Sequence, residues 1–331
     1  MIRLPARISH QPSTATALCR TLHDFSSVIA LDIVPTMPAH PPDNDCLCWQ
    51  SLSGVVAKVM QRSDVSGTAF RRLATKAGEI CGLVLASLMS SAALAAEPIV
   101  INSSDRQTAV LELYTSEGCS SCPRADRWLS KLVTTPQQDL DVLALAFHVD
   151  YWDYLGWKDR FSSADYTKRQ RVLGANNLQR TIYTPEFFVN GMEARGSGNI
   201  LDKIQQTNQK PAPLALHMIV SRDKSELVVA LQAPAERGTI GQIHHRYLVY
   251  ENNLSTDVKR GENSGEVLHH QQVVRYMSPA QSLQTENQHR ITIDPDWQSE
   301  NIGIAVLVTS PGDRHYLQAV HTPVASLLAV H

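Results

Sequence analysis

The chain has 331 residues, of which 43% are hydrophobic and 19% charged, and this length allows about two domains of ordinary size. The composition excludes a disordered, collagen-like or coiled-coil protein. The formal net charge of −2 gives no basic surface of the kind that attracts nucleic acid, so we expect no nucleic-acid partner.

The six cysteines are distributed unevenly along the chain. Four of them precede residue 100, and the remaining two are Cys119 and Cys122. The role of the first hundred residues therefore decides how many cysteines the working protein keeps.

The segment 71–96 carries the three parts of a secretory signal peptide. A basic flank at 71–76 precedes an apolar run at 80–96, which ends in the small residues of Ala93-Leu94-Ala95. We predict a signal peptide here; the alternatives are a buried core helix or a retained anchor, and only an anchor would bring this protein to a membrane. The basic flank places the following residues outside the cytoplasm, so the protein is expected to be periplasmic or secreted.

The residues before this segment have no place in a normal signal peptide, which lies at the start of a chain. Residues 1–70 are rich in Pro, Ser and Ala and show weak periodicity. We expect them to be disordered or to come from an over-extended translation start, with a cytoplasmic tail as the alternative.

The pattern over 97–211 alternates between strand-like and helix-like segments. Apolar runs predict strands, and apolar residues at helical spacing predict helices, while Asn190-Gly191 predicts a hairpin turn. The predicted elements are, in order, a strand at 109–115, a helix at 122–133, a strand at 141–149, a helix at 163–176, strands at 181–190 and 192–195, and a helix at 199–208. This order is that of the thioredoxin fold, so we expect an α/β thioredoxin-like domain over 97–211.

Beyond residue 211 the pattern becomes one of strands separated by turn residues. The predicted strands lie at 214–221, 226–233, 243–251, 267–277, 290–293, 302–309 and 315–321. Such a series is typical of a β-sandwich, so we expect a β-rich, sandwich-like domain over 212–331.

Cys119 and Cys122 form a C-x-x-C motif at the junction between the first predicted strand and the first predicted helix. The positive end of a helix dipole favours a thiolate, so Cys119 is the expected nucleophile and the more exposed thiol, and Cys122 is the expected resolving thiol. Half of a zinc site or an inert disulfide would give the same motif. The strand–helix context favours redox chemistry, and a loop this short makes a poor stabilising disulfide.

Thr184-Pro185 precedes the apolar strand residues 186–189. Thioredoxin-fold proteins place a cis-proline at this point, where the residue before it can pair with an extended peptide. We therefore predict that Pro185 is cis and belongs to the active site, and that Thr184 binds substrate; an ordinary trans proline at a strand start is the alternative.

The loop after the second predicted strand carries His148, Asp150 and Trp152. Loops at the carboxyl ends of strands border the site in open α/β sheets, so these residues are predicted to form a substrate-binding wall, with His148 or Asp150 as proton carrier. An aromatic cap on the loop is the alternative. Glu112, a carboxylate in an apolar strand, is predicted to accept the proton of Cys122, unless it faces solvent at an edge.

Two pairs of adjacent histidines, His244-His245 and His269-His270, invite a metal interpretation. Both pairs lie on predicted strands, where neighbouring side chains point to opposite faces, so neither pair can chelate through both rings. We therefore predict no metal site and no cofactor.

Several motifs together resemble a bacterial secreted thioredoxin-like family of unknown function. They are Tyr114 to Pro123, Ala125-Asp126, Phe147 to Trp157 and Tyr183 to Pro185. The resemblance extends from residue 109 to about 325, including the Gly-Glu-Asn within 258–266. It implies a fold and a redox role but no particular substrate. Arg124 departs from the family, whose members often have a second proline there, and residues 1–70 have no counterpart.

These observations give three functional hypotheses. The first is an exported thiol–disulfide oxidoreductase that acts on protein thiols or disulfides. The second is a copper carrier or metallochaperone that uses both thiolates with His148, since soft sulfur ligands suit Cu(I). The third is a non-catalytic binding module in which the β-rich half does the work. The sequence leaves the direction of electron transfer and the oligomeric state open.

Overall fold

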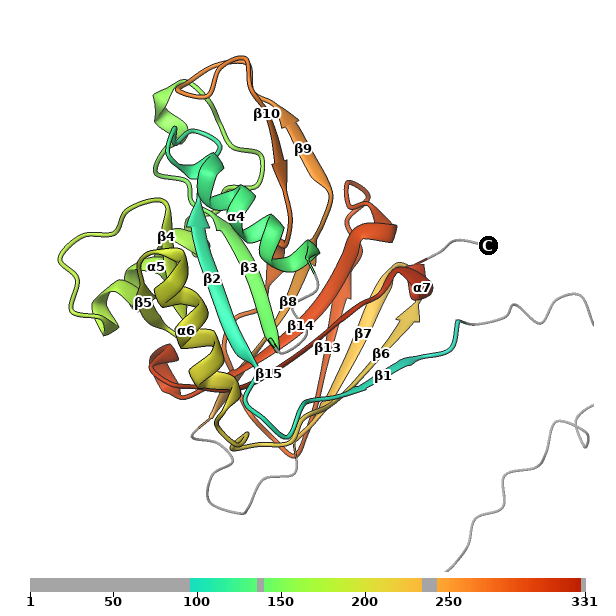
Figure 1. Ribbon diagram of the computed structural model, residues 1–331. Helices are drawn as coiled ribbons and strands as arrows, with labels where there is room; N and C mark the ends of the chain where they lie inside the picture. The colour runs from blue at the N-terminus through green and yellow to red at the C-terminus, as the bar shows by residue number, and fades with distance from the viewer. Residues whose placement is uncertain (1–95, 136–139, 234–242, 329–331) are drawn as a thin grey trace, which may run out of the picture. The chain divides into compact units, whose positions relative to one another are not determined.

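The computed structural model describes residues 96–135, 140–233 and 243–328 (Figure 1). These residues belong to one compact unit, Ala92–His331. The predicted extension over 1–70 and nearly all of the predicted signal peptide over 71–96 lie outside the described residues. Among the described residues, no helix is long and apolar enough to span a bilayer.

Strands make up most of the regular structure. They are β1 (Ile99–Asn102), β2 (Ala109–Thr115), β3 (Val142–His148), β4 (Glu186–Val189), β5 (Met192–Ala194), β6 (His217–Asp223), β7 (Glu226–Gln232), β8 (His244–Glu251), β9 (Leu254–Asp257), β10 (Val267–His270), β11 (Val273–Met277), β12 (Gln281–Ser282), β13 (Glu286–Thr292), β14 (Ile302–Thr309) and β15 (Tyr316–Pro323). The α-helices of the described residues are α4 (Cys122–Thr134), α5 (Ala164–Asn176), α6 (Ser197–Asn208) and α7 (Ala325–Leu328), and the 3₁₀ turns are η1 (Asp153–Leu155), η2 (Ser299–Asn301) and η3 (Pro311–Asp313).

A nine-stranded sheet forms the centre of the described structure. Its strands run in the order β15-β14-β8-β11-β3-β2-β4-β5, and β12 pairs with β8. β2 and β3 are parallel, so their carboxyl ends meet at one edge of the sheet. On the other side of β3 lies β11, also parallel, with Val273 opposite Ala146. The strands before and after residue 211 therefore share one sheet.

Both faces of this sheet are covered. On one face α4 and α6 pack against β2 to β5 (Figure 1), in a core of Ala109, Leu111, Leu113, Ala125, Leu129, Leu132, Ala144, Val189, Ala194, Ile200 and Ile204. The opposite face carries α5 and one apolar cluster that continues from β2 to β15. The four-stranded sheet β1-β6-β7-β13 packs through a third cluster against β8 and β14, on the face of these strands opposite the cluster that continues from β2 to β15.

The expectation of an α/β thioredoxin-like domain followed by a β-rich, sandwich-like domain is wrong. The described residues contain fifteen strands in three sheets and only four α-helices. Individual elements were predicted well, and the strand at 109–115 has the predicted bounds. The error concerns pairing: β3 has two edges, and the free one is taken by a strand that lies more than a hundred residues further along the chain. Local periodicity carries no signal for such a partner.

Helix α4 follows from its sequence. Ala125, Leu129 and Leu132 lie on the buried face, and Pro123 occupies the first turn, where its missing N–H costs no helical hydrogen bond. No side chain caps the amino end of α4, and the first turn of the helix contains no acidic residue. Its positive end is therefore free to act on the cysteine turn that precedes it.

The register between β8 and β14 can be tested at Gly303. This residue lies opposite Tyr250, and a Cβ at Gly303 would overlap the buried Tyr250 ring. Gly303→Ala should therefore lower the free energy of unfolding by about 1–3 kcal/mol, the usual cost of overpacking. Urea denaturation measures this.

The matched control is Gly198→Ala in the first turn of α6, where a Cβ meets nothing within 4 Å. That variant should be neutral or more stable by up to about 1 kcal/mol, because alanine is the better helix former. A Gly303→Ala protein as stable as the wild type would contradict the register.

Candidate functional site

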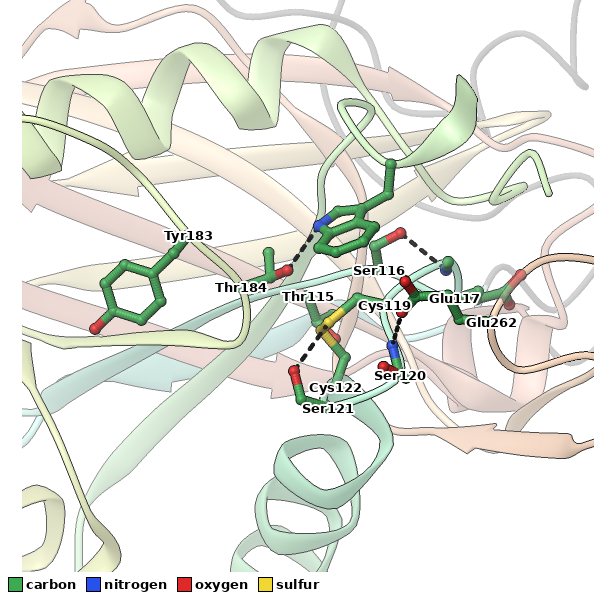
Figure 2. The surroundings of a disulfide bond; sticks show 12 residues. Thr115, Ser116, Glu117, Cys119, Ser120, Ser121, Cys122, Tyr183, Thr184 and Glu262 are labelled. Atoms are coloured by element: carbon green, nitrogen blue, oxygen red, sulfur yellow. Dashed lines mark hydrogen bonds between the residues drawn. A yellow bond between two sulfur atoms is a disulfide. The ribbon is translucent and has the colours of Figure 1, made fainter. Parts of the chain in front are cut away.

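The two cysteines lie where β2 passes into α4, and they form a disulfide with Cα atoms 5.4 Å apart (Figure 2). Cys122 is the first residue of α4, and its N–H donates to the Cys119 carbonyl at 3.2 Å. The exposed fractions are 1% for Cys119 and 0% for Cys122. Cys119 was expected to be the more exposed of the two, but it is buried as well, because other segments pack against the turn.

One of these segments comes from beyond residue 211. The loop between β9 and β10 places Asn263 against the cysteine turn, where its Nδ2 donates to the carbonyl oxygens of Glu117 at 2.8 Å and Cys119 at 3.0 Å. The Ser120 N–H donates to Glu262 Oε2 at 3.0 Å (Figure 2). Interaction with the Ser120 side chain and with this N–H lowers the pKa of Glu262. The loop thus fixes the turn through three hydrogen bonds.

The second segment carries the proline. The Thr184–Pro185 bond is cis, as expected. The Trp152 indole N–H donates to the Thr184 hydroxyl at 2.7 Å, so the loop after β3 is tied to the residue before the proline (Figure 2). A groove of about 460 Å³ lies beside Pro185 and is lined by Tyr183, Pro185, Phe187, Ala194, Arg195 and Gly196. The structure thus brings Thr184 and Trp152 together.

His148, at the end of β3, forms a buried ion pair with Asp159. Its Nδ1 lies 2.6 Å from Asp159 Oδ2, and both side chains are 0% exposed. Burial lowers the pKa of His148, but the charge and hydrogen bond of Asp159, together with the charges of Asp126 and Glu117, outweigh burial, and the pKa is raised. Burial would likewise raise the pKa of Asp159, yet the charge and hydrogen bond of His148 lower it. The same Asp159 oxygen accepts the Glu117 N–H at 2.9 Å, which ties the pair to the cysteine turn.

A second buried pair joins Glu117 to His270 of β10. Glu117 Oε1 lies 3.3 Å from His270 Nε2, without the geometry of a hydrogen bond, and Glu117 Oε2 accepts the Trp157 indole N–H at 2.8 Å. The His148 and His270 rings meet edge to face at 5.0 Å. The two pairs are therefore neighbours.

Asp126 of α4 completes this group of buried titratable residues. It is 6% exposed, and its Oδ2 accepts the Thr115 hydroxyl at 3.1 Å. Burial raises the pKa of Asp126, although the charges of His270 and His148 partly oppose that shift. We define the buried polar cluster as Glu117, Asp126, His148, Asp159 and His270.

The sequence identified only His148 among these five as a site residue. His269 is exposed whereas His270 is buried, as the alternation along a strand requires. A signal for Asp126 was present, because it is a charged residue on the apolar face of the predicted helix, four residues after Cys122. Asn263 lies in the Gly-Glu-Asn of the family resemblance and His270 in the second histidine pair, but neither was assigned to the cysteine site.

Asp150 and Glu112, two further predicted site residues, engage other partners. Asp150 Oδ1 accepts the Thr167 hydroxyl of α5 at 2.6 Å. Glu112 forms a bidentate pair with Arg169, at 2.9 Å from Nε and 2.8 Å from Nη2. Tyr114 and Tyr316 donate their hydroxyls to the same carboxylate. Both Glu112 oxygens are thus occupied, and none of these hydrogen bonds involves Cys122.

In the described residues, no group of three or more His, Cys, Asp or Glu side chains is arranged to hold a metal ion. His244 and His245 point to opposite faces of β8, and His245 is buried. Burial lowers the pKa of His245 to about 4.

The position of Glu112 gives a prediction. Glu112→Ala leaves the buried Arg169 short of a partner and should cost about 3–5 kcal/mol in the free energy of unfolding. The milder Glu112→Gln removes the carboxylate but keeps the side-chain shape. In this variant the reduced cysteines should react with glutathione disulfide at the wild-type rate across pH 6–9.

Asp223→Ala is the control, because its ion pair with Arg290 is half exposed and contributes at most about 1 kcal/mol. If Glu112→Gln folded normally but slowed the cysteine reaction tenfold, Glu112 would be a proton acceptor after all.

Comparison with known proteins places the chain in a family. HBP35 of Porphyromonas gingivalis is 16% identical, with 67% of this chain and 76% of that chain covered and a TM-score of 0.51, which is a likeness of fold alone. A structural-genomics protein of Agrobacterium tumefaciens is 22% identical, with 66% of this chain and 95% of that chain covered and a TM-score of 0.48. No curated protein matches the chain. The model of a protein family of unknown function, DUF1223, matches residues 110–309, in agreement with the resemblance to an uncharacterised family, and the chain therefore belongs to the DUF1223 family.

Proposed function

We propose that this protein is an exported thiol–disulfide oxidoreductase that exchanges electrons with protein thiols or disulfides through Cys119 and Cys122. One observation carries the proposal: the disulfide closes a very short loop at the amino end of a helix that has no side-chain cap. Such a loop restrains the unfolded chain little, so the bond adds little stability. The helix end, however, favours the thiolate that exchange chemistry requires.

The exchange has two steps, written here for reduction of a partner. The Cys119 thiolate attacks a sulfur of the partner's disulfide, and the partner's other sulfur leaves as a thiolate with the electron pair. Cys122 then loses its proton and attacks Cys119 Sγ; the Cys119–Cys122 disulfide forms, and the second partner sulfur leaves as a thiolate. The two departing thiolates take up protons from solvent. Read backwards, the same steps oxidise a partner dithiol.

Access to Cys119 requires a local movement, since the disulfide is buried. The loop that carries Glu262 and Asn263 is held on the cysteine turn by three hydrogen bonds to backbone groups. A neutral hydrogen bond contributes about 1 kcal/mol and one to a carboxylate about 1.5–3 kcal/mol, so a partner can displace the loop at a cost of a few kcal/mol. The groove beside Pro185 offers an extended peptide a place along the residues around the cis proline.

Export is part of the proposal and rests on the composition of residues 71–96. An oxidising compartment also suits a pair that cycles through a disulfide.

Trapping of partners tests the proposal. Cys122→Ala removes the resolving thiol, so mixed disulfides through Cys119 should accumulate and appear as higher bands on non-reducing gels of periplasmic extracts. The bands should disappear after reduction, and mass spectrometry should identify Cys119 as the linked residue.

The control is the double variant Cys119→Ala/Cys122→Ala, which removes both thiols of the pair and leaves the rest of the chain unchanged. Identical band patterns from Cys122→Ala and the double variant would show that Cys119 exchanges with no partner and would refute the proposal.

A further inference from the structure

The exchange reaction needs a group that takes the proton of Cys122, and the described structure offers a candidate other than Glu112. Asp126 lies four residues after Cys122 on α4, so the two side chains occupy the same face of the helix on successive turns. Both are buried. Thr115, which donates to the Asp126 carboxylate, ends the strand that leads into the cysteine turn (Figure 2).

The other members of the buried polar cluster are already engaged with one another. His148 is paired with Asp159 at 2.6 Å, and Glu117 lies 3.3 Å from His270 and accepts the Trp157 indole N–H. Asp126 and Glu117 each accept one hydrogen bond from a neutral side chain, but Glu117 also lies 3.3 Å from His270 Nε2, whereas Asp126 has no ion pair among the described residues. A buried carboxylate with one neutral hydrogen-bond donor and no ion pair is the member of the cluster that can most readily gain a proton.

Asp126 also borders a small cavity. The space measures about 60 Å³, lies between α4 and β10, and is lined by Pro123, Asp126, Arg127, Val267, Leu268, His269 and His270. This volume accommodates water, which requires roughly 10–15 Å³ of such space per molecule. The His270 side chain is 2% exposed, and neither ring nitrogen has a hydrogen-bond partner among the described residues. The lining is mostly apolar, but the Asp126 carboxylate and the unpartnered His270 ring nitrogens are groups with which an internal water would form hydrogen bonds.

We propose that Asp126 takes the proton of Cys122 when Cys122 attacks the mixed disulfide, and that the cavity lined by His270 connects Asp126 to solvent. This inference rests on the proposed function and assigns the proton route of the same site. Asp126 then carries one proton while the new Cys119–Cys122 bond forms and the partner sulfur leaves with its electron pair. The proton passes to cavity water, and Asp126 returns to the carboxylate.

The charged groups around Asp126 are compatible with this role. His148 faces it from β3 and His270 from β10, Asp159 and Glu117 carry the opposing charges, and Arg127 and His269 border the cavity. Burial raises the pKa of Asp126 from its ordinary value, although the charges of His270 and His148 oppose the shift, and a raised pKa lies closer to that of a thiol and favours transfer between the two groups.

The test separates the two thiol steps. Reduced full-length protein is mixed with glutathione disulfide and quenched with acid at intervals, and mass spectrometry follows formation and loss of the glutathione adduct on Cys119. In Asp126→Asn, formation of the adduct should stay within twofold of the wild type. Its loss through Cys122 should slow at least tenfold at pH 7, because general base catalysis contributes about 10²–10⁴-fold. The pH of half-maximal resolution should also rise by at least one unit.

A merely structural or electrostatic Asp126 predicts the opposite sign. Removal of a nearby negative charge would make Cys122 easier to ionise and would speed resolution. Resolution in Asp126→Asn that is as fast as, or faster than, in the wild type would therefore overturn the inference, while normal adduct formation would leave the proposed function intact. A wild-type protein that forms no adduct at all would instead refute the proposed function.

Two further variants keep the test independent of folding. Asp126→Glu retains the carboxylate, and the adjoining cavity has room for one more methylene, so this variant should recover most of the resolution rate. Asp202→Asn removes an exposed acid of α6 and should behave as the wild type. If Asp126→Asn unfolds, Asp126→Glu is compared with a folded Asp126→Ser variant instead. Asp126→Glu should resolve the adduct faster than Asp126→Ser, and equal rates in the two variants would overturn the inference.

Discussion

The parallel pairing of β11 with β3 is the interaction on which the candidate site depends. The Ala146 N–H donates to the Gln272 carbonyl at 2.8 Å, and Val273 lies opposite Ala146. β10 ends at His270, two residues before this contact. The pairing therefore fixes the β9–β10 hairpin beside the carboxyl ends of β2 and β3, and so brings Asn263 and His270 to the cysteine turn. Without it the turn would lack the loop that holds its backbone.

The polar groups behind the disulfide are costly to bury. A buried polar atom without a partner costs about 1–3 kcal/mol, and Glu117 Oε1, His148 Nε2 and both nitrogens of His270 have no hydrogen-bond partner among the described residues. A cluster kept only for stability would be replaced by apolar side chains at little loss. Proteins retain such arrangements mainly where chemistry needs them, and here they lie next to the only pair of cysteines in the described residues.

The second buried network has a different role. Arg169 of α5 joins Glu112 of β2 to Asp313 of η3, and both Glu112 oxygens are hydrogen-bonded. This network connects segments from the two ends of the described chain and holds α5 on the sheet. The burial of Glu112 in β2 is thus explained by its ion pair with Arg169, and not by the cysteines.

The sequence was informative wherever the structure depends on neighbouring residues. The strand at 109–115 and the start of a helix at Cys122 were predicted from local patterns and agree with the structure. The cis bond before Pro185 was predicted by analogy with thioredoxin-fold proteins and is also present. The segment 267–277 was predicted to be one strand, but it divides near Gln272, whose φ is +59°, into β10 and β11 with different partners. That division redirects the chain and sends His270 toward the cysteines.

Long-range partners were the part that local patterns could not supply. Glu112 meets Arg169 across 57 residues, and Asn263 meets Cys119 across 144 residues. Neither contact has a signature within a window of a helix or strand. The predicted thioredoxin-like division of the chain failed for the same reason, because the pairing of β11 with β3 is not encoded in the periodicity of either strand.

The most direct test of the account is the reduction potential of the Cys119–Cys122 pair in the folded protein. The full-length protein is equilibrated with mixtures of reduced and oxidised glutathione or dithiothreitol, free thiols are alkylated, and the oxidised fraction of this pair is measured by peptide mass spectrometry. Near-ultraviolet circular dichroism monitors the fold. The account predicts a reversible two-electron transition between about −120 and −270 mV, the range of disulfide-exchange proteins, with the fold retained. A pair that stays oxidised below about −300 mV, or that is reduced only when the protein unfolds, would identify an inert structural disulfide and contradict the account.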